Sequence, residues 1–569
     1  MVAMRGLKAI GQMLLGEKII TLEQLELALR EQKEKKEYFC RTLVRLGLAK
    51  EEDVFPILAT QLQVAFVKIK ELNIPPEVIK KVPAKFVSHY KLMPIALKGN
   101  ILTMAMSDPV DVHTIDDLRL FLAVEIEPVL AGDEDIAEAI RKYYGVGAET
   151  LEEMIIEKGT GYQEAVSISK AEDLTTMAED ASIVKFVNQI MLEALKDRAT
   201  DIHMEPFENQ FRVRFRIDGI LYDITIPPSI RIFNQAIVSR IKIMSSLDIA
   251  EHRLPQDGRM KIKVEEKELD LRISIVPSSF GESVHIRILS PESFLELEKL
   301  GHLPEDLKII ESLIKKPHGI IFVTGPTGSG KTTSLYACLA KINVRPIKII
   351  TIEDPIEYQL KGITQIQIAP KIGLTFANGL RSMLRHDPDI MMVGEVRDYE
   401  TAEIAIRAAL TGHLVFSTLH TNDAAGAITR LLDMGVEPFL VSSSLECLIA
   451  QRLVRLVCPA CKHEINPDKK YLQGLGLDIE PNIKLFEGKG CAECRFTGYR
   501  GRTGIYEILL VNGKIRDMVI RKESSQQIKK EAVLQGMKTL RLDGWQKVKM
   551  GLTTVAEIIR VTQQEELPE

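Results

Sequence analysis

The chain has 569 residues, a net charge of −5 and 45% hydrophobic residues. Its length predicts several separate cores, because typical domains have about 100–150 residues. No apolar run is long enough to span a membrane, the amino end lacks the pattern of a signal peptide, and the acidic total argues against nucleic acid as a partner. We therefore expect a multidomain protein that stays in the cytoplasm.

The amino-terminal segment 1–62 contains a weak internal repeat, whose two copies match at a constant spacing. Both copies have the apolar periodicity of helices, which predicts a helical amino-terminal module over 1–62. The matched positions are Leu14 with Leu43, Ile19 with Leu48, Leu25 with Val54, Leu29 with Leu58, and Gln32 with Gln61.

Residues 63–148 alternate strand-like runs such as GNILTMAMSDP with helical runs such as DEDIAEAIRKYYG. This alternation predicts a small α/β domain. Residues 149–180 are rich in acids and poor in large apolar side chains, a composition typical of flexible linkers. We expect this linker to let the two sides move independently.

A further domain is predicted over 181–297, where a helical run is followed by segments such as FRVRFRIDGILYDI. Alternating apolar and polar residues indicate a mixed antiparallel sheet. From residue 298 to 569, apolar strands such as GIIFVTG and HLVFSTLH alternate with amphipathic helices. That order predicts a parallel sheet in an α/β core.

The motif GPTGSGKTT is the strongest chemical signal, and it lies between a predicted strand and a predicted helix. Glycines let backbone N–H groups surround phosphates, Lys331 reaches the β and γ phosphates, and Thr332 can ligate Mg²⁺. The motif predicts binding of a nucleoside triphosphate. The residues assigned to this role are Gly325, Pro326, Thr327, Gly328, Ser329, Gly330, Lys331, Thr332 and Thr333.

The strand that closes such a site normally ends in a metal-holding aspartate, but IMMVGEVRD has Gly394 there, followed by Glu395. The segment TIEDPIEYQ supplies Glu353 and Glu357 after a neighbouring strand, and strand carboxyl ends face the ligand crevice in α/β sheets. We therefore expect Glu353 near the nucleotide and Mg²⁺ near Thr332, Glu357 and Glu395. Glu395 is then the residue that orients or deprotonates the attacking water. A solvated turn remains the alternative for the acidic segment.

Two histidines bracket the strand in GHLVFSTLHTNDA. His420 follows the strand, on the predicted crevice side, where an imidazole can contact the γ phosphate. His413 precedes it, and the sequence leaves a structural and a functional role equally open.

Two CxxC pairs, separated by the segment 462–490, lie near the carboxyl end. Two matched pairs of thiolates predict a tetrahedral structural zinc site, with a redox motif as the alternative. The predicted zinc element spans 455–505, and its ligands are Cys458, Cys461, Cys491 and Cys494.

Several arginines lie in segments where they could reach a phosphate oxygen from a neighbouring subunit or domain. Surface ion pairs are the alternative, and spacing does not separate the two. These residues are Arg272, Arg287, Arg381, Arg385, Arg500 and Arg502.

With these motifs, the chain resembles the secretion ATPase superfamily, and within it the assembly ATPases of type IV pili and of type II secretion. The motifs that carry the resemblance are GPTGSGKTT, ITIEDPIEYQ, LRHDPDIMMVGEVRD and GHLVFSTLHTNDA. In that family the third motif usually lacks the aspartate. The resemblance implies a RecA-like P-loop ATPase core with a zinc element over 298–569, a PAS-like α+β domain over 181–297, and hydrolysis of ATP with Mg²⁺.

The resemblance also implies an assembly. In similar proteins the PAS-like domain packs on the ATPase core of the next subunit in a hexameric ring, so that Arg272 and Arg287 reach toward nucleotide. Arg381, Arg385 and Arg502 match further arginines near the phosphates. The implied oligomeric state is a homohexamer, which acts at the cytoplasmic face of the inner membrane. Its implied partners there are an inner-membrane platform protein (PilC/GspF-like) and cytoplasmic assembly proteins (PilM/GspL-like).

The zinc element and the α/β domain, with its MSDPVDVHTIDDLR segment, point to the assembly branch of the superfamily rather than to pilus retraction. We expect a motor for pilus assembly, with type II secretion as the alternative and nucleic-acid translocation as a weaker one. The helical segment 1–62 is similar to a module that binds cyclic di-GMP through RLGxxL motifs. Here the copies AIGQML and FCRTLV each lack part of that motif, so a docking module is an equal alternative.

Overall fold

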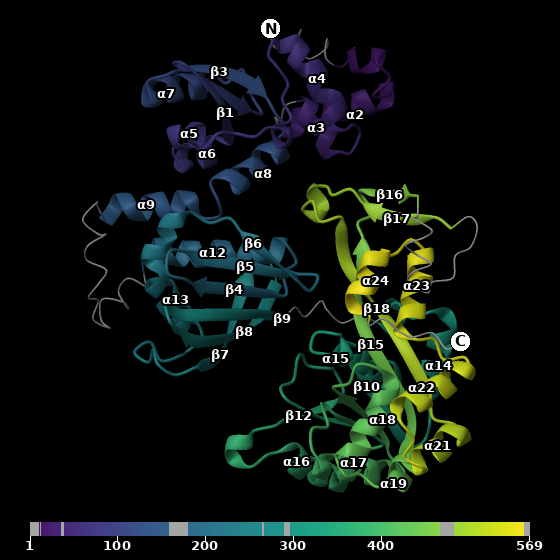
Figure 1. The fold of residues 1–569 in the computed structure, drawn as a ribbon. Helices are drawn as coiled ribbons and strands as arrows, with labels where there is room; N and C mark the ends of the chain where they lie inside the picture. The colour runs from purple at the N-terminus through teal and green to yellow at the C-terminus, as the bar shows by residue number, and fades with distance from the viewer. Residues whose placement is uncertain are drawn as a thin grey trace. The chain divides into compact units, whose positions relative to one another are not determined.

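The computed structural model describes residues 11, 13–35, 39–158, 180–264, 267–289, 296–466 and 483–562. The chain divides into two compact units, Met1–Ile288 and Leu289–Glu569 (Figure 1). This division lies before the predicted boundary at 297. Over the described ranges, no helix combines the length and the apolar character needed to cross a bilayer.

The amino-terminal module is helical, and its two repeats have the same backbone geometry. Lys18 (φ 58°) and Gly47 (φ 66°), which are equivalent positions of the two copies, both adopt the left-handed conformation after a helix. The matched pair of Leu14 and Leu43 is fully buried in one core. The labelled helices of the module are α2 (Leu22–Lys35), α3 (Phe39–Arg45) and α4 (Glu51–Leu62).

A small α/β domain follows, as the alternating pattern predicts. Its three strands pair in the order β1-β2-β3, the first pair antiparallel and the second parallel. The elements are α5 (Pro76–Lys81), α6 (Ala84–Tyr90), β1 (Leu92–Lys98), β2 (Ile101–Met106), α7 (Val112–Leu122), β3 (Glu125–Leu130) and α8 (Asp133–Tyr143).

The predicted linker over 149–180 is wrong for its first part, 149–158. Helix α9 (Ala148–Lys158) places Leu151 and Met154 at 2% and 1% exposure in the same core as Phe186 of α12 (Ala181–Lys196). Leucine and methionine three positions apart share one helix face, and burial of that face outweighs the acidic composition on which the linker prediction rested. The rest of the predicted linker, 159–179, lies outside the described residues.

A six-stranded sheet forms the next domain, in the order β6-β5-β4-β9-β8-β7. The pairs β4–β5, β4–β9, β5–β6 and β7–β8 are antiparallel, as the alternating sequence predicts. One face carries Ile202, Phe215 and Ile286, which pack with α12 and α13, and the other face is polar. The elements are β4 (Asp201–Pro206), β5 (Phe211–Ile217), β6 (Ile220–Ile224), α13 (Asn234–Met244), β7 (Gln256–Val264), β8 (Lys267–Ser278) and β9 (Gly281–Leu289).

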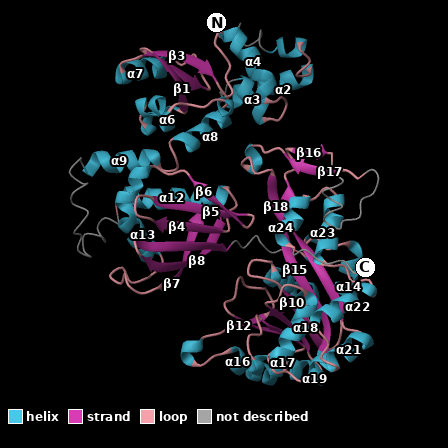
Figure 2. Cartoon of the chain, in the orientation of Figure 1, coloured by secondary structure: helices cyan, strands magenta, loops and turns pink. Residues whose placement is uncertain are grey.

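The second unit contains a seven-stranded sheet in the order β12-β11-β13-β14-β10-β15-β18, with helices packed around it (Figure 2). All neighbours are parallel except β15 and β18. The strands are β10 (Gly319–Thr324), β11 (Ile349–Glu353), β12 (Thr364–Gln367), β13 (Ile390–Val393), β14 (Leu414–Leu419), β15 (Leu445–Val457) and β18 (Tyr499–Leu510).

Helices connect these strands and also form the carboxyl-terminal part of the second unit. Strands β10, β11, β13 and β14 are nearly continuous apolar runs, as expected for strands covered on both faces. The helices are α14 (Pro304–Leu313), α15 (Lys331–Ile342), α16 (Phe376–Met383), α17 (Tyr399–Leu410), α18 (Ala424–Asp433), α19 (Pro438–Ser444), α21 (Gly513–Ile520), α22 (Ser525–Leu534), α23 (Leu540–Lys549) and α24 (Val555–Val561).

Strands β15 and β18 are the longest of the core and extend beyond it to the hairpin of β16 (Lys462–Ile465) and β17 (Leu485–Gly488) (Figure 1). Helix α24 supports this extension. Its Glu557, 2% exposed, accepts a hydrogen bond of 2.6 Å from Arg455 of β15. Because a buried carboxylate is costly unless paired, this ion pair fixes α24 on the strand.

We predict that Leu151→Ala destabilises the six-stranded domain by about 2 kcal/mol or more, the scale of a buried leucine truncation. Hydrogen–deuterium exchange of α12 should become faster, because Leu151 packs in its core. The matched control is Leu254→Ala, since that leucine is 61% exposed in the same unit. Unchanged exchange of α12 in Leu151→Ala would contradict the placement of α9.

Candidate functional site

The phosphate-loop motif lies at the carboxyl end of β10, which pairs with β14 on one side and β15 on the other. The strand β10 is buried along its whole length, and the chain then turns through Gly325, Gly328 and Gly330 before α15 begins. Their φ angles of 153°, 79° and 86° favour glycine over other residues. The loop therefore leads directly into the amino end of α15, a position that favours anions.

Gly325 allows a close approach between this loop and strand β15. A Cβ atom there would lie 2.6 Å from the Gln451 carbonyl oxygen and 2.6 Å from Ser329 Oγ. Ser329 is 4% exposed, and its Oγ has no hydrogen-bond partner among the described residues. A buried hydroxyl without a partner suits a loop that receives a polar ligand.

Lys331 begins α15, and its Nζ donates hydrogen bonds to the Gly325 and Pro326 carbonyl oxygens at 2.8 and 3.1 Å. Burial lowers the pKa of Lys331 to about 8, although the charge of Glu395 acts in the opposite direction. A phosphate at this position would favour the ammonium form again.

Glu395 follows β13 and is the centre of a small charged cluster. Its side chain is 12% exposed, and its two oxygens lie 2.5 Å from Arg397 and 3.4 Å from His420 Nε2. His420 follows β14, and burial and the charge of Lys331 lower its pKa. The structure therefore brings Lys331, Glu395 and His420 together from three neighbouring strand ends.

Gly394 occupies the position where an aspartate is normally found, and the packing explains the glycine. A Cβ atom there would lie 3.3 Å from Glu353 Cα and 3.3 Å from the Ile352 carbonyl oxygen. The Gly394 N–H also donates to that carbonyl at 2.8 Å. The end of β13 thus lies too close to β11 for a side chain to enter without displacement.

Glu353 was expected to lie near the nucleotide, but in the structure its carboxylate is buried and bonded to other protein groups. Its carboxylate is 2% exposed and accepts hydrogen bonds from Tyr336 of α15, from Thr351 at 2.6 Å and from Gln365 at 3.1 Å. The bond with Tyr336 ties the acidic segment to the helix that follows the phosphate loop. On the same segment Glu357 is half-buried and Asp354 is exposed, so these two acids retain access to solvent.

Three of the predicted arginines of the second unit are bonded to residues outside the phosphate loop. Arg381 pairs with Glu400 at 2.5 Å, and Arg385 donates to the Arg381 carbonyl oxygen at 2.9 Å. Arg502 is exposed on β18, and Arg500 pairs with Glu493. The bonds described for Arg381, Arg385 and Arg500 do not involve the phosphate loop.

The other two arginines lie on the polar face of the six-stranded sheet. Arg287 donates to Asp201 at 3.0 Å, and Arg272 lies opposite Arg259 in the register of β7 and β8. Burial opposes ionisation of Asp201, but hydrogen bonds from His285, Thr200 and Arg287 hold its pKa below the usual range. This face is therefore a surface rich in charged side chains.

Two further residues of the site, Arg397 and Arg452, were not predicted from the sequence. Arg397, the partner of Glu395, stands only two positions after it in GEVRD and could have been found from that spacing. Arg452 of β15 lies beside the phosphate loop, but it belongs to no recognised motif.

His413, whose role the sequence left open, precedes β14 at the edge of the sheet opposite the phosphate loop. Its Nδ1 lies 2.9 Å from the Ala408 carbonyl oxygen, to which it donates when that nitrogen carries the proton. This contact with the end of α17 supports a structural role.

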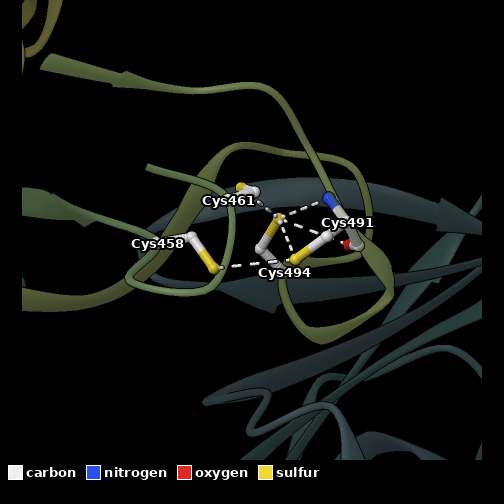
Figure 3. A group of neighbouring side chains, drawn as sticks. All are labelled: Cys458, Cys461, Cys491 and Cys494. Atoms are coloured by element: carbon white, nitrogen blue, oxygen red, sulfur yellow. Dashed lines mark hydrogen bonds between the residues drawn. The ribbon is translucent and has the colours of Figure 1, made fainter. Parts of the chain in front are cut away.

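The four cysteines of the two CxxC pairs converge at the end of the β15 and β18 extension (Figure 3). Three pairs of their Sγ atoms are 3.7 to 3.8 Å apart. A zinc tetrahedron with Zn–S bonds of about 2.3 Å has edges of about 3.8 Å. Although burial acts against it, N–H groups of Cys491 and Gly498 lower the pKa of Cys494 to about 7, which favours the thiolate.

A parallel sheet whose phosphate loop, glutamate and histidine meet at one edge defines a P-loop nucleoside triphosphatase. The chain matches the family described as Type II/IV secretion system protein over residues 176–560, and it belongs to this family. The resemblance found in the sequence is thereby confirmed, and with it the α/β ATPase core and ATP hydrolysis as the family activity. Residues 62–150 match the MshEN domain.

Individual relatives extend these matches over nearly the whole chain. The chain is 43% identical to the type IV pilus assembly ATPase PilB of Myxococcus xanthus over 97% of its own length and 98% of that protein. It is also 43% identical to type II secretion system protein E of Pseudomonas aeruginosa, over 85% of the chain and 97% of that protein. The solved structure of the ATPase DotB of Legionella pneumophila covers 66% of this chain and 95% of its own, at 21% identity and a TM-score of 0.50, and supports the fold alone.

We predict that Gly394→Ala destabilises the ATPase core by about 1–3 kcal/mol, the scale of an overpacked site. The added methyl group would press on Glu353 and Ile352. Thermal unfolding followed by circular dichroism would measure the loss. Gly513→Ala is the matched control, because a Cβ there meets nothing within 4 Å. Equal stability of the two variants would contradict the packing explanation.

Proposed function

We propose that the chain is a hexameric motor ATPase that drives type IV pilus assembly at the cytoplasmic face of the inner membrane. The observation that carries this proposal is the similarity to the pilus assembly ATPase of Myxococcus xanthus along almost the full length of both proteins. The cluster of Lys331, Glu395 and His420 supplies the chemistry that such a motor needs.

Type II secretion is the second candidate function. The type II secretion protein of Pseudomonas aeruginosa has the same identity of 43%, so the core alone does not separate the two. The share of this chain that is covered favours pilus assembly by a small margin, since it is 97% for the Myxococcus xanthus protein and 92% for type II secretion system protein E of Xanthomonas campestris. Nucleic-acid translocation has no support from the net charge of −5.

Hydrolysis would use the groups at the carboxyl edge of the sheet. Lys331 and the amino end of α15 would hold the phosphates, and Glu395 would take the proton of the attacking water. Its bond to Arg397 would keep the carboxylate oriented. Thr332, Glu357 and Glu395 would hold Mg²⁺, whose preference for hydroxyl, carboxylate and phosphate oxygens fits this set of donors.

The arginines would act between subunits. Arg381 is bonded to Glu400 and Arg385 to the Arg381 carbonyl oxygen in this chain, and we propose that these two arginines and Arg502 reach the phosphates held by a neighbouring copy. Arg272 and Arg287, on the polar sheet face, would complete the neighbour's site in the same way. Binding would then draw two rigid bodies together, and hydrolysis would release them.

The partners proposed for this motor are an inner-membrane platform protein and cytoplasmic assembly proteins. The amino-terminal module would dock on them and hold the motor at the membrane periphery. Cyclic di-GMP binding remains a weaker proposal, because neither copy of the helical repeat has the complete RLGxxL motif.

The cysteine cluster would hold one structural zinc ion per chain. The distances between sulfur atoms fit a tetrahedral site, and backbone N–H groups of Gly490, Cys491 and Gly498 donate to Cys461 and Cys494. Four protein ligands leave no open position for chemistry. The metal would therefore stabilise the extension of β15 and β18.

We predict that Lys331→Ala and Glu395→Gln impair Mg²⁺-dependent ATP hydrolysis in different ways. Lys331→Ala should weaken ATP binding, because it removes the phosphate-facing ammonium group. Glu395→Gln should still bind ATP but hydrolyse it about 100-fold or more slowly, the scale of losing a general base. Binding by fluorescence and phosphate release would separate the two effects. Wild-type turnover in Glu395→Gln would assign the water-activating role elsewhere, with Glu357 as the first alternative.

We predict one zinc ion per chain in protein purified without chelators, measured by elemental analysis. Cys458→Ser should lose this zinc and lower the unfolding temperature before it changes the ATPase constants. Cys447→Ala is the control, since that thiol is buried in the core sheet away from the cluster and should leave the zinc content unchanged. Metal-free wild-type protein would refute the zinc site.

We predict that Arg272→Ala lowers turnover without unfolding the chain, and that mixing it with Glu395→Gln chains restores part of the activity. Restoration requires that an intact arginine and an intact glutamate meet at one subunit interface. Mixed hexamers would be verified by mass spectrometry before assay. If two folded, inactive variants gave no activity in such hexamers, the arginine would not act between subunits.

A further inference from the structure

Arg452 occupies a position between two loops of the proposed ATPase site. The register of β10 and β15 pairs Thr324 with Ala450, so β15 continues alongside the phosphate loop where β10 has ended. A Cβ atom at Gly325 would lie 3.1 Å from Arg452 Nη1. One end of the guanidinium therefore lies against the first glycine of the phosphate loop.

The other end of the guanidinium reaches the loop that carries His420. Arg452 Nη2 donates to the Asn422 carbonyl oxygen at 2.9 Å and to Asn422 Oδ1 at 3.3 Å. Asn422 is two positions after His420, whose imidazole lies beside Glu395. A planar guanidinium can hold two groups at fixed separation, which a lysine cannot do.

The acceptors of Arg452 are neutral, which is unusual for a half-buried arginine. It donates to the Gln451 and Asn422 carbonyl oxygens and to the Asn422 amide oxygen. The ion pairs found in the described part of the chain include none for this guanidinium. Glu507 and Asp423 act on it only at longer range, and burial lowers its pKa. Holding a cation here without an ion pair costs stability, and such a cost is typical of a functional position.

Other contacts hold the rest of the His420 loop without touching the phosphate loop glycines. Thr421 is bonded to Thr324, and Asp423 lies 3.6 Å from Lys529 of α22. Lys529 also lies 3.5 Å from Glu507 of β18. Of these two cations, Arg452 and Lys529, it is Arg452 that lies against Gly325.

We propose that Arg452 is a positioning residue for ATP hydrolysis, which couples the phosphate loop to His420 within a single subunit. The guanidinium fixes the distance between Gly325 and Asn422. It thereby places His420 against Glu395 when the phosphate loop holds its ligand. This inference rests on the proposed ATPase function and adds a residue that acts in its own subunit.

A double-mutant cycle on the full-length chain tests the coupling. Arg452→Gln should lower kcat about 10-fold in the presence of His420, with a change in KM of less than about 3-fold, because the loops are misplaced while the phosphate contacts remain. In the His420→Ala background the same substitution should change kcat less than about 2-fold, since coupled residues are not additive. If Arg452→Gln also lowered kcat about 10-fold in the His420→Ala background, the proposal would be overturned.

Two further variants separate positioning from charge and from general loosening of the loop. Arg452→Lys keeps the charge but not the planar fork, so it should be as slow as Arg452→Gln; wild-type kcat in this variant would overturn the proposal. Lys529→Gln, the matched control, should leave kcat within about 2-fold of wild type. An equal loss in Lys529→Gln would also overturn it, because any loosening of the loop would then suffice.

The variants are compared only when their circular dichroism spectra and elution volumes match the wild type. If Arg452→Gln does not fold, Arg452→Lys replaces it in the double-mutant cycle with His420→Ala. An inactive wild-type chain would refute the ATPase function, whereas an active wild-type chain with unaffected Arg452 variants would refute this inference alone.

Discussion

The candidate site depends on one constraint, the parallel pairing of β11, β13, β14 and β10. Parallel neighbours all end at the same edge of a sheet, so the loops that follow them meet there. Lys331, Glu395 and His420 come from three such loops and form one cluster, although they are far apart in the sequence. Antiparallel pairing of any of these strands would carry its loop to the opposite edge.

The same edge shows how the site can function without the usual aspartate. Gly394 lies so close to β11 that a side chain there would press on Glu353 and Ile352. Glu353 in turn is held by Tyr336 from the helix after the phosphate loop. The close packing of β11 against β13 leaves little room for a side chain at 394, and Glu395 is the acid after this strand that interacts with Lys331 and His420.

Strand β15 joins the two chemical features of the second unit. It passes the phosphate loop at Gln451 and Arg452 and ends immediately before Cys458 of the cysteine cluster. Its partner β18 and the buried pair of Arg455 with Glu557 make this extension stiff. A metal at the cluster would thus stabilise the strand that also carries the residue we propose as the link between the two catalytic loops.

The sequence by itself determined the features that depend on local pattern. The phosphate-loop motif, the apolar strands of the parallel sheet, the helical repeat and the two cysteine pairs were all evident, because residue type and spacing set these features directly. Tertiary structure decided what depends on packing between distant segments. It placed α9 in a core despite its acidic residues, buried Glu353 in a protein network and brought Arg452 to the phosphate loop, because each outcome depends on contacts with chain that no local window contains.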